Sequence, residues 1–252
     1  MGGMTVTARV AGAACWAELD AGDSADLDAV TAFYGAVLGW TPDASPSAEH
    51  QQLAVHAGGV PVAALGSPGA ATPPAWTLYL AVDNVDAAAE ALEELGGQVL
   101  HGPEDDLAGG RLLVALDAGG AAVGLWESDD ALPAPGPGRL CWAEAASAEP
   151  GTTRTFYRAL FGWEIDDDDE DGAGRLVCRG EDGRALAGLG LAGDALPHWL
   201  PVFAVADADA ALAAARDAGG TVVTPVSEGP RGRQATLTDP AGARFGVIRI
   251  PG

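Results

Sequence analysis

The first clear pattern along the chain is an amphipathic helix near residues 26–38. Its apolar side chains fall at positions i, i+3, i+4, i+7 and i+8: Val30, Phe33, Tyr34, Val37 and Leu38. This spacing gathers them on one face of an α-helix. Short apolar runs flank the helix at 15–19, 52–56 and 60–65, and these runs predict strands. The first quarter of the chain is therefore expected to form a strand, a helix and further strands.

The next quarter repeats this order. A strand predicted at 77–82 leads through Asp83, the expected N-cap, into a second helix. The apolar face of that helix carries Val85, Ala88, Leu92 and Leu95. Gly96 and Gly97 follow the last of these residues, as is typical of a helix C-terminus. Further strands are expected at 98–100, 111–116 and 121–126.

The second half of the chain repeats the first. Cys15-Trp16-Ala17-Glu18 recurs as Cys141-Trp142-Ala143-Glu144, 126 residues later. Phe33-Tyr34 with Gly39-Trp40 recurs as Phe156-Tyr157 with Gly162-Trp163, 123 residues later, and helices are correspondingly expected near 152–161 and 209–218. Self-similarity at a fixed spacing indicates repeated structural units. We therefore expect an α+β fold of four βαβββ modules, two in each of two tandem domains.

A stretch rich in proline and glycine separates the two repeats. Residues 132–138 read Leu-Pro-Ala-Pro-Gly-Pro-Gly, a sequence that suits neither a helix nor a central strand. We therefore expect a first domain over 14–130, a linker over 131–138 and a second domain over 139–252.

Charge limits the partners that this chain can have. Its 252 residues include 36 acidic and 13 basic side chains, which gives a formal charge of −23, and every basic residue is Arg. Such a surface repels phosphate backbones and anionic lipid, so nucleic acid and membranes are not expected as partners. The same charge attracts cationic ligands, although a simple gain in solubility also explains it.

The N-terminus and the cysteines bear on the compartment. Residues 1–14 lack the apolar run of a signal peptide, and the chain has no run of about 18 apolar residues that could span a bilayer. Cys15, Cys141 and Cys178 cannot form a closed disulfide framework. We expect a cytoplasmic protein, and its oligomeric state, monomer or homodimer, stays open.

Three segments of the chain resemble a known superfamily. They are 31–40 (Thr-Ala-Phe-Tyr-Gly-Ala-Val-Leu-Gly-Trp), 155–163 (Thr-Phe-Tyr-Arg-Ala-Leu-Phe-Gly-Trp) and 239–246 (Asp-Pro-Ala-Gly-Ala-Arg-Phe-Gly). Together with the paired βαβββ modules they resemble the vicinal oxygen chelate superfamily, which contains glyoxalases, bleomycin-resistance proteins and extradiol dioxygenases. The resemblance covers 14–127 and 139–250, and the tandem arrangement is similar to a two-domain glyoxalase-like subgroup. It implies that each pair of modules curls into a cup-shaped sheet.

The resemblance also implies where a metal would bind. Metal-dependent members bind a divalent cation through His, Gln or Glu from the first strand and Glu from the last strand of each module. In this chain, the residue-by-residue match puts the following residues at the metal-ligand positions: Trp16, Thr77, Gly124, Trp142, Leu200 and Gly246. Indole, aliphatic side chains and glycine offer no suitable lone pair, and a lone hydroxyl is a poor ligand. We therefore expect neither a metal nor a cofactor at these positions.

Strand alternation predicts which side chains line the cups instead. In the first domain they are Trp16, Glu18, Thr77, Tyr79 and Trp126, and in the second domain Trp142, Glu144, His198 and Arg244. Aromatic faces suit flat, conjugated or cationic ligands. We expect the two glutamates to be candidate catalytic bases and the other residues to bind a ligand.

Each of these residues also has a purely structural interpretation. Trp16 and Trp142 could fill the cups as core residues, and His198 could be an ordinary surface residue. Glu18 and Glu144 could be solvated, could anchor a ligand by hydrogen bonds or could act as general bases.

Two functions are consistent with these features. The first is a metal-independent protein that binds a planar or cationic small molecule, a drug-like compound or secondary metabolite, as in the bleomycin-resistance branch. The second is a glyoxalase- or dioxygenase-type enzyme, a lyase, isomerase or oxygenase. Such an enzyme would be cofactor-free with Glu18 or Glu144 as base, or would use an atypical metal site such as Glu144 with His198. Whether the protein is an enzyme stays open.

Overall fold

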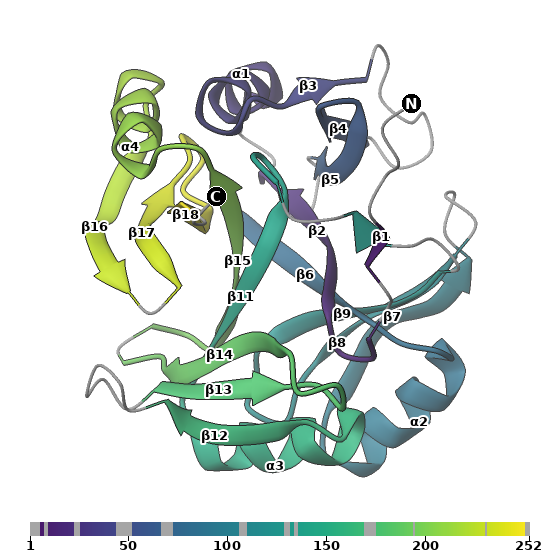
Figure 1. The fold of residues 1–252 in the computed structure, drawn as a ribbon. Helices are drawn as coiled ribbons and strands as arrows, with labels where there is room; N and C mark the ends of the chain where they lie inside the picture. The colour runs from purple at the N-terminus through teal and green to yellow at the C-terminus, as the bar shows by residue number, and fades with distance from the viewer. Residues whose placement is uncertain are drawn as a thin grey trace. The chain divides into compact units, whose positions relative to one another are not determined.

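The computed structural model describes most of the chain (Figure 1). The described residues are 6–7, 10–22, 26–43, 52–66, 73–105, 110–128, 132–133, 136–168, 175–193, 195–229 and 231–249. Across these ranges, every helix is too short or too polar to cross a membrane.

Two βαβββ modules form the first repeat. Module 1 consists of β2 (Ala14–Asp20), α1 (Leu27–Leu38), β3 (Thr41–Pro42), β4 (Gln52–Ala57) and β5 (Val60–Gly66). Module 2 consists of β6 (Ala75–Ala81), α2 (Val85–Glu94), β7 (Gln98–Asp105), β8 (Arg111–Leu116) and β9 (Ala122–Glu127).

Two further modules form the second repeat. Module 3 consists of β11 (Leu140–Ser147), α3 (Pro150–Phe161), β12 (Glu164–Asp168), β13 (Arg175–Arg179) and β14 (Ala185–Leu191). Module 4 consists of β15 (His198–Val205), α4 (Ala208–Asp217), β16 (Thr221–Gly229), β17 (Gly232–Thr238) and β18 (Arg244–Arg249). The prediction of an α+β fold with four βαβββ modules is confirmed.

In each module the first strand pairs in parallel with the last. This holds for β2 with β5, β6 with β9, β11 with β14 and β15 with β18, whereas the later strands of a module pair as antiparallel hairpins. The two eight-stranded sheets have the orders β3-β4-β5-β2-β6-β9-β8-β7 and β12-β13-β14-β11-β15-β18-β17-β16. The short strands β1 (Val6–Thr7) and β10 (Leu132–Pro133) pair with each other, so two residues of the predicted linker form a strand.

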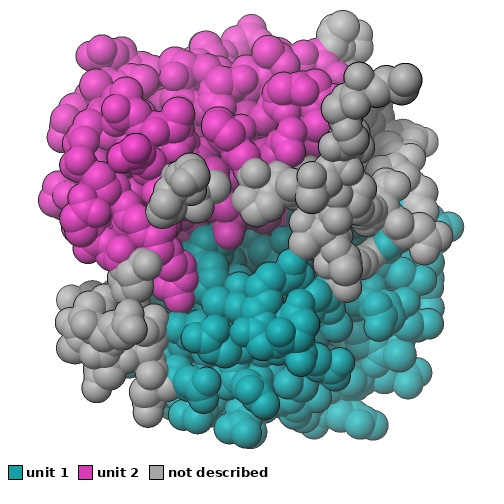
Figure 2. All heavy atoms as spheres, in the orientation of Figure 1, with its two compact units in different colours: residues 1–15, 78–134, 142–200 teal, residues 16–77, 135–141, 201–252 magenta. Residues whose placement is uncertain are grey.

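The chain divides into two compact units (Figure 2). Unit 1 comprises residues 1–15, 78–134 and 142–200, and unit 2 comprises residues 16–77, 135–141 and 201–252. Unit 1 therefore holds the helices of modules 2 and 3, and unit 2 holds those of modules 1 and 4. Each unit contains segments of both repeats, so the units do not coincide with the two domains expected on either side of the linker. Those domain boundaries stay a prediction.

Unit 2 has an aromatic core. Its helices α1 and α4 lie against each other, and the core includes the rings of Phe33, Tyr34, Trp40, Trp76, Phe203 and Phe245. Tyr34 stacks on Trp40 with ring centroids 5.1 Å apart and meets Trp76 edge to face. Such ring pairs stabilise a core beyond the area that they bury, so the repeated Phe-Tyr and Gly-Trp motifs serve packing.

Unit 1 repeats this arrangement with module 3. Tyr157 stacks on Trp163 with ring centroids 5.1 Å apart and meets Trp199 edge to face. Helices α2 and α3 lie against each other in this unit. The equivalent tyrosines therefore occupy equivalent positions in the cores of the two units.

Helices α1, α2 and α4 each start at a residue whose side chain caps the helix. Asp26 caps α1, and Asn84 caps α2 by accepting a hydrogen bond from the backbone N–H of Ala87 at 2.8 Å. The expectation that Asp83 caps α2 is wrong. The cap must lie directly before the first helical residue for its side chain to reach the N–H groups of the first turn, and that position belongs to Asn84.

Helices α1 and α3 end at glycines in the left-handed conformation. Gly39 has φ +72° and Gly162 has φ +67°, values that glycine adopts without strain. The tryptophans that follow, Trp40 and Trp163, are buried. The Gly-Trp motif thus ends the helix and places an indole in the core.

Candidate ligand-binding site

The first strand of each repeat carries a tryptophan and a glutamate on one face. On β2, Trp16 Nε1 donates a hydrogen bond to Glu18 Oε1 at 3.2 Å. On β11, Trp142 Nε1 donates to Glu144 Oε1 at 2.6 Å. Residues two apart on a strand face the same side, and the alanine between each pair is fully buried on the other side. Each indole therefore orients a carboxylate beside it.

The two pairs differ in what lies opposite the carboxylate. Glu144 is in register with Gly188 of β14, and a Cβ atom added to that glycine would lie 2.2 Å from Glu144 Oε2. Glu18 is in register with Ala64 of β5 instead. The carboxylate of the second repeat therefore lies directly against bare backbone, and it makes the shorter hydrogen bond to its indole.

On the last strands, the space beside the positions where the superfamily has metal ligands is occupied by side chains of the neighbouring strand. Tyr79 is in register with Gly124, and a Cβ atom at this glycine would lie 2.2 Å from Tyr79 Cδ1. In module 4, a Cβ atom at Gly246 would lie 2.9 Å from Val202 Cγ2. A carboxylate ligand has no space at either position without movement of a side chain. The residues present do not fit the divalent cation that the superfamily implies.

No other cluster compensates for this within the described part of the chain. Among those residues, no group of three or more His, Cys, Asp and Glu side chains is placed to hold a metal ion. His198 is half-buried, and its Nδ1 lies 2.8 Å from the carbonyl oxygen of Leu196. Its ring is thereby oriented by its own loop.

The structure places the remaining predicted site residues on three other strands, β6, β9 and β18. Trp126, in unit 1, packs over Gly110, where an added Cβ atom would lie 2.5 Å from the indole Nε1. Thr77 is half-buried on β6 and Arg244 is exposed at the start of β18, both in unit 2. Their roles in binding stay predictions.

The thiol of the cysteine before each tryptophan donates a hydrogen bond to a backbone carbonyl oxygen. The thiol of Cys15 donates to the Tyr79 carbonyl oxygen at 3.3 Å, and that of Cys141 donates to the Val202 carbonyl oxygen at 3.4 Å. Burial raises the pKa of Cys141 to about 12. A thiol that stays protonated is a poor nucleophile, so Cys141 is poorly suited to covalent catalysis.

The sequence reasoning missed two buried hydrogen-bond chains. In unit 2, Trp76 Nε1 donates to the Tyr34 hydroxyl at 3.1 Å, and this hydroxyl donates to Asp239 Oδ2 at 3.0 Å. In unit 1, Trp199, Tyr157 and Asp117 repeat the chain at 2.9 Å for each bond. We call these the unit 2 and unit 1 Trp–Tyr–Asp chains.

Both aspartates of these chains are buried and carry shifted pKa values. Burial raises the pKa of Asp239 and of Asp117, and this outweighs the hydrogen bonds from the backbone N–H groups and the tyrosines, which lower it. Each Oδ1 accepts two N–H groups of its own turn. The aspartate therefore fixes the turn and ties it to the helix that carries the tyrosine.

A sequence signal for these chains was present. Asp117 and Asp239 recur 122 residues apart, and Trp76 and Trp199 recur 123 apart. Retention of a tryptophan, a tyrosine and an aspartate in both repeats is what a buried polar chain requires, since each group needs its partner. The spacing alone does not reveal which aspartate meets which tyrosine.

Comparison with known proteins places this geometry in a family. The glyoxalase-like domain matches residues 19–125 and again residues 142–248. The anthracycline biosynthesis protein DauV of Streptomyces sp. (strain C5) is 33% identical over 95% of this chain and 94% of its own length. The putative glyoxylase CFP32 of Mycobacterium tuberculosis (strain CDC 1551 / Oshkosh) is 34% identical over 93% of each chain.

Solved structures show the same fold at low sequence identity. The Mn(II)-bound glyoxalase from Novosphingobium aromaticivorans is 16% identical, with a TM-score of 0.68 over 96% of this chain and 85% of that chain. The 2,2',3-trihydroxybiphenyl 1,2-dioxygenase from Sphingomonas wittichii strain RW1 is also 16% identical, with a TM-score of 0.64 over 96% and 92%. The resemblance inferred from sequence is confirmed. The chain belongs to the glyoxalase-like domain family of the vicinal oxygen chelate superfamily, with the domain present twice in tandem.

Proposed function

We propose that this protein binds a planar aromatic small molecule through its Trp–Glu pairs, without a metal at the superfamily's ligand positions. The relatives from Streptomyces are named anthracycline biosynthesis proteins, and anthracyclines are polycyclic aromatic compounds. The partly exposed indole of Trp16 offers such a compound an aromatic surface, whereas the Trp142 indole is only 7% exposed and orients Glu144. The carboxylate beside it accepts hydrogen bonds from hydroxyl or amino groups on the rings.

The observation that carries this proposal is the Trp142–Glu144 pair over Gly188. The indole N–H holds the carboxylate at 2.6 Å, and the glycine leaves room for it against β14. A group held in position before the ligand arrives loses less entropy on binding than a mobile one does. We therefore assign the stronger binding to this pair rather than to Trp16 and Glu18.

The filled ligand positions support the absence of a metal requirement. Tyr79 lies over Gly124 and Val202 lies over Gly246, where metal-dependent relatives in the superfamily would need an acidic side chain. We expect the purified protein to contain less than a stoichiometric amount of iron, manganese, nickel, cobalt or zinc after incubation with each salt. Stoichiometric uptake of any of these ions, measured by mass spectrometry of the metal, would contradict this part of the proposal.

Binding is tested with a simple hydroxyanthraquinone, 1,4-dihydroxyanthraquinone, by isothermal titration calorimetry. Glu144→Gln removes the charged acceptor, and we expect at least a tenfold weaker Kd, since a hydrogen bond to a charged group is worth about 1.5–3 kcal/mol. Gly188→Ala displaces the carboxylate, so it should weaken binding similarly. The fold tolerates alanine at the equivalent position, Ala64.

The matched control lies two residues further along the same strand. A Cβ atom added to Gly190 would meet nothing within 4 Å, so Gly190→Ala should bind as tightly as the native protein. If Gly188→Ala and Gly190→Ala bind equally well, or if Glu144→Gln keeps full affinity, the ligand does not use this carboxylate.

A second function is favoured by the same oriented carboxylate. A glutamate fixed by an indole N–H in a half-buried site can act as a general base, and relatives from Mycobacterium are named putative glyoxylases. A glyoxalase assay with the native protein tests this function. Turnover that is lost in Glu144→Gln supports the enzyme, whereas turnover unchanged in both Glu144→Gln and Glu18→Gln excludes a glutamate base.

A further inference from the structure

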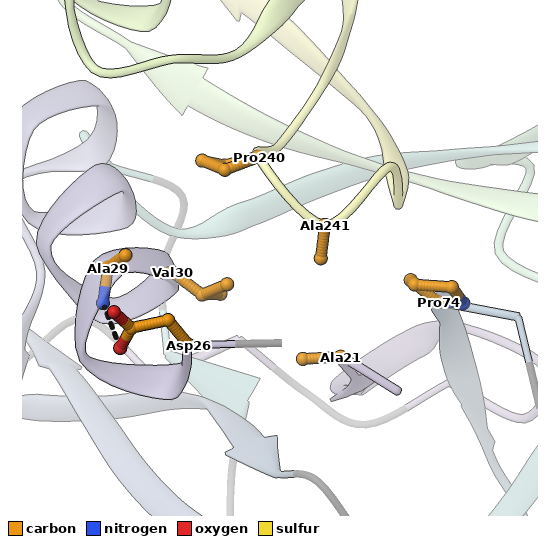
Figure 3. Close-up of a pocket in the computed structure, with 7 residues that line it drawn as sticks. All are labelled: Ala21, Asp26, Ala29, Val30, Pro74, Pro240 and Ala241. Carbon is orange, nitrogen blue, oxygen red and sulfur yellow. Dashed lines mark hydrogen bonds between the residues drawn. The ribbon is translucent and has the colours of Figure 1, made fainter. Parts of the chain in front are cut away.

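A hollow of about 280 Å³ opens beside the first helix of unit 2 (Figure 3). Its lining comes from the end of β2, the start of α1, the approach to β6 and the turn after β17: Ala21, Asp26, Ala29, Val30, Pro74, Pro240 and Ala241. Figure 3 shows the side chains of Val30, Ala21, Pro74 and Ala241 converging on the same space. Six of the seven lining residues are apolar, and the seventh, Asp26, carries a carboxylate that is turned toward the backbone N–H of Ala29 (Figure 3).

The equivalent position in unit 1 carries polar groups. Ser147 and Thr153 stand where unit 2 has Ala21 and Val30, and their hydroxyls are hydrogen-bonded to each other at 2.7 Å. A Cβ atom added to Gly119 would lie 2.3 Å from Thr153 Oγ1. The apolar side chains that line the hollow in unit 2 are therefore not repeated at the equivalent positions of unit 1.

The Asp26 carboxylate is held in place at the start of α1. Its Oδ1 accepts hydrogen bonds from the backbone N–H groups of Asp28 at 3.1 Å and Ala29 at 3.2 Å. A carboxylate has a second oxygen and further lone pairs for a ligand. The hollow thus combines apolar side chains with polar surface and with a carboxylate that is fixed at the start of α1.

We propose that this hollow binds a compact hydrophobic amine, with the apolar part against Val30, Pro74 and Pro240 and the ammonium group at Asp26. The volume is near the lower end of small-molecule sites, which is about 300 Å³, so a single ring with a short chain fits it. The formal charge of −23 on the chain adds to the attraction for a cation. This site is separate from the Trp–Glu pairs and does not depend on the function proposed for them.

The test compares 2-phenylethylamine with its neutral analogue 2-phenylethanol. Binding is followed by the NMR chemical shifts of the Ala29, Val30 and Ala241 methyl groups in the full-length protein. We expect both compounds to shift these signals and the amine to bind more tightly. Asp26→Asn keeps the helix cap, because asparagine caps as well as aspartate does, and should weaken only the amine, by up to about fivefold for an exposed ion pair.

Two substitutions on α1 complete the test. Ala29 lines the hollow and is exposed on the helix, so Ala29→Leu should fill the space and reduce the affinity for both compounds at least tenfold. Ala36 is also exposed on α1 but lies outside the lining, so Ala36→Leu should bind as the native protein does. Absence of binding, equal binding of the amine to the native protein and Asp26→Asn, or full binding to Ala29→Leu would each overturn the proposal.

Discussion

Trp40 and Trp163 occupy the same place in the two repeats but differ in one hydrogen bond. Trp40 Nε1 donates to the carbonyl oxygen of Gly138 at 2.6 Å. Trp163 Nε1 is buried and has no acceptor among the residues that the structure describes. Both indoles stack on a tyrosine with nearly the same geometry, although Trp40 also meets Trp76 and Phe203 and Trp163 meets Phe161.

This difference predicts unequal costs for the same substitution. Trp40→Phe breaks a buried hydrogen bond, whereas Trp163→Phe removes a donor that has no partner in the described part of the chain. We expect Trp40→Phe to lower the free energy of unfolding by about 1 kcal/mol more than Trp163→Phe does. Urea denaturation followed by circular dichroism measures both variants. An equal or larger loss in Trp163→Phe would show that the Gly138 hydrogen bond contributes little.

At the scale of elements, the unit 2 Trp–Tyr–Asp chain joins helix α1 to the turn between β17 and β18. Tyr34 supplies the hydroxyl and Asp239 the carboxylate. Because burial raises the pKa of Asp239 above its usual 3.8, the folded protein binds this proton more tightly than the unfolded chain does. The stabilisation from this group is complete below the unfolded pKa and is lost as the pH rises through the raised value.

The sign of this effect can be tested with Asp239→Asn, which does not titrate. We expect the difference in Tm between the native protein and this variant to become less favourable to the native protein as the pH rises from about 3 to about 7. Asp207 is the matched opposite, since backbone N–H groups of α4 hold the pKa of its carboxyl below its usual range. For Asp207→Asn the advantage of the native protein should grow over the same pH range. The reverse trend for Asp239 would contradict the effect of burial.

The sequence predicted the elements better than their connections. Apolar periodicity located α1 because Phe33, Tyr34 and Leu38 lie on one face, and the repeat carried that assignment over to α3. Capping was harder to predict, since Asp83 and Asn84 are both good caps and only the helix start decides between them. The hydrogen bond from Tyr34 to Asp239 links residues 205 apart, and no local pattern encodes such a pairing.

The candidate site was predictable to a similar degree. Strand alternation correctly placed Trp142 and Glu144 on one face, because a period of two needs no tertiary information. The contact of Glu144 with Gly188 depends on how β11 and β14 align, and the filling of Gly124 by Tyr79 depends on the register of β6 with β9. Parallel register is set by the whole module, so neither contact follows from a motif.

At the scale of the whole molecule, each unit needs both repeats. The unit 1 chain joins Tyr157 of one repeat to Asp117 of the other, and Trp40 of the first repeat bonds to Gly138 at the end of the linker. We therefore expect that residues 14–130 and 139–252, produced separately, lack cooperative thermal unfolding and regain it when mixed. Near-ultraviolet circular dichroism during heating measures this. A sharp transition in either half alone would show that the halves fold independently.

The pairing of module 1 with module 4 also has a consequence for how the protein is made. Ribosomes add about 5–20 residues per second, and Asp239 follows Tyr34 by 205 residues. Helix α1 therefore leaves the ribosome roughly 10–40 s before its partner turn exists. During that interval its apolar face is available to chaperones, while the two modules of unit 1, which are adjacent in the chain, can already assemble. The protein is thus expected to complete unit 1 first, during translation, and to close unit 2 only after module 4 has left the ribosome.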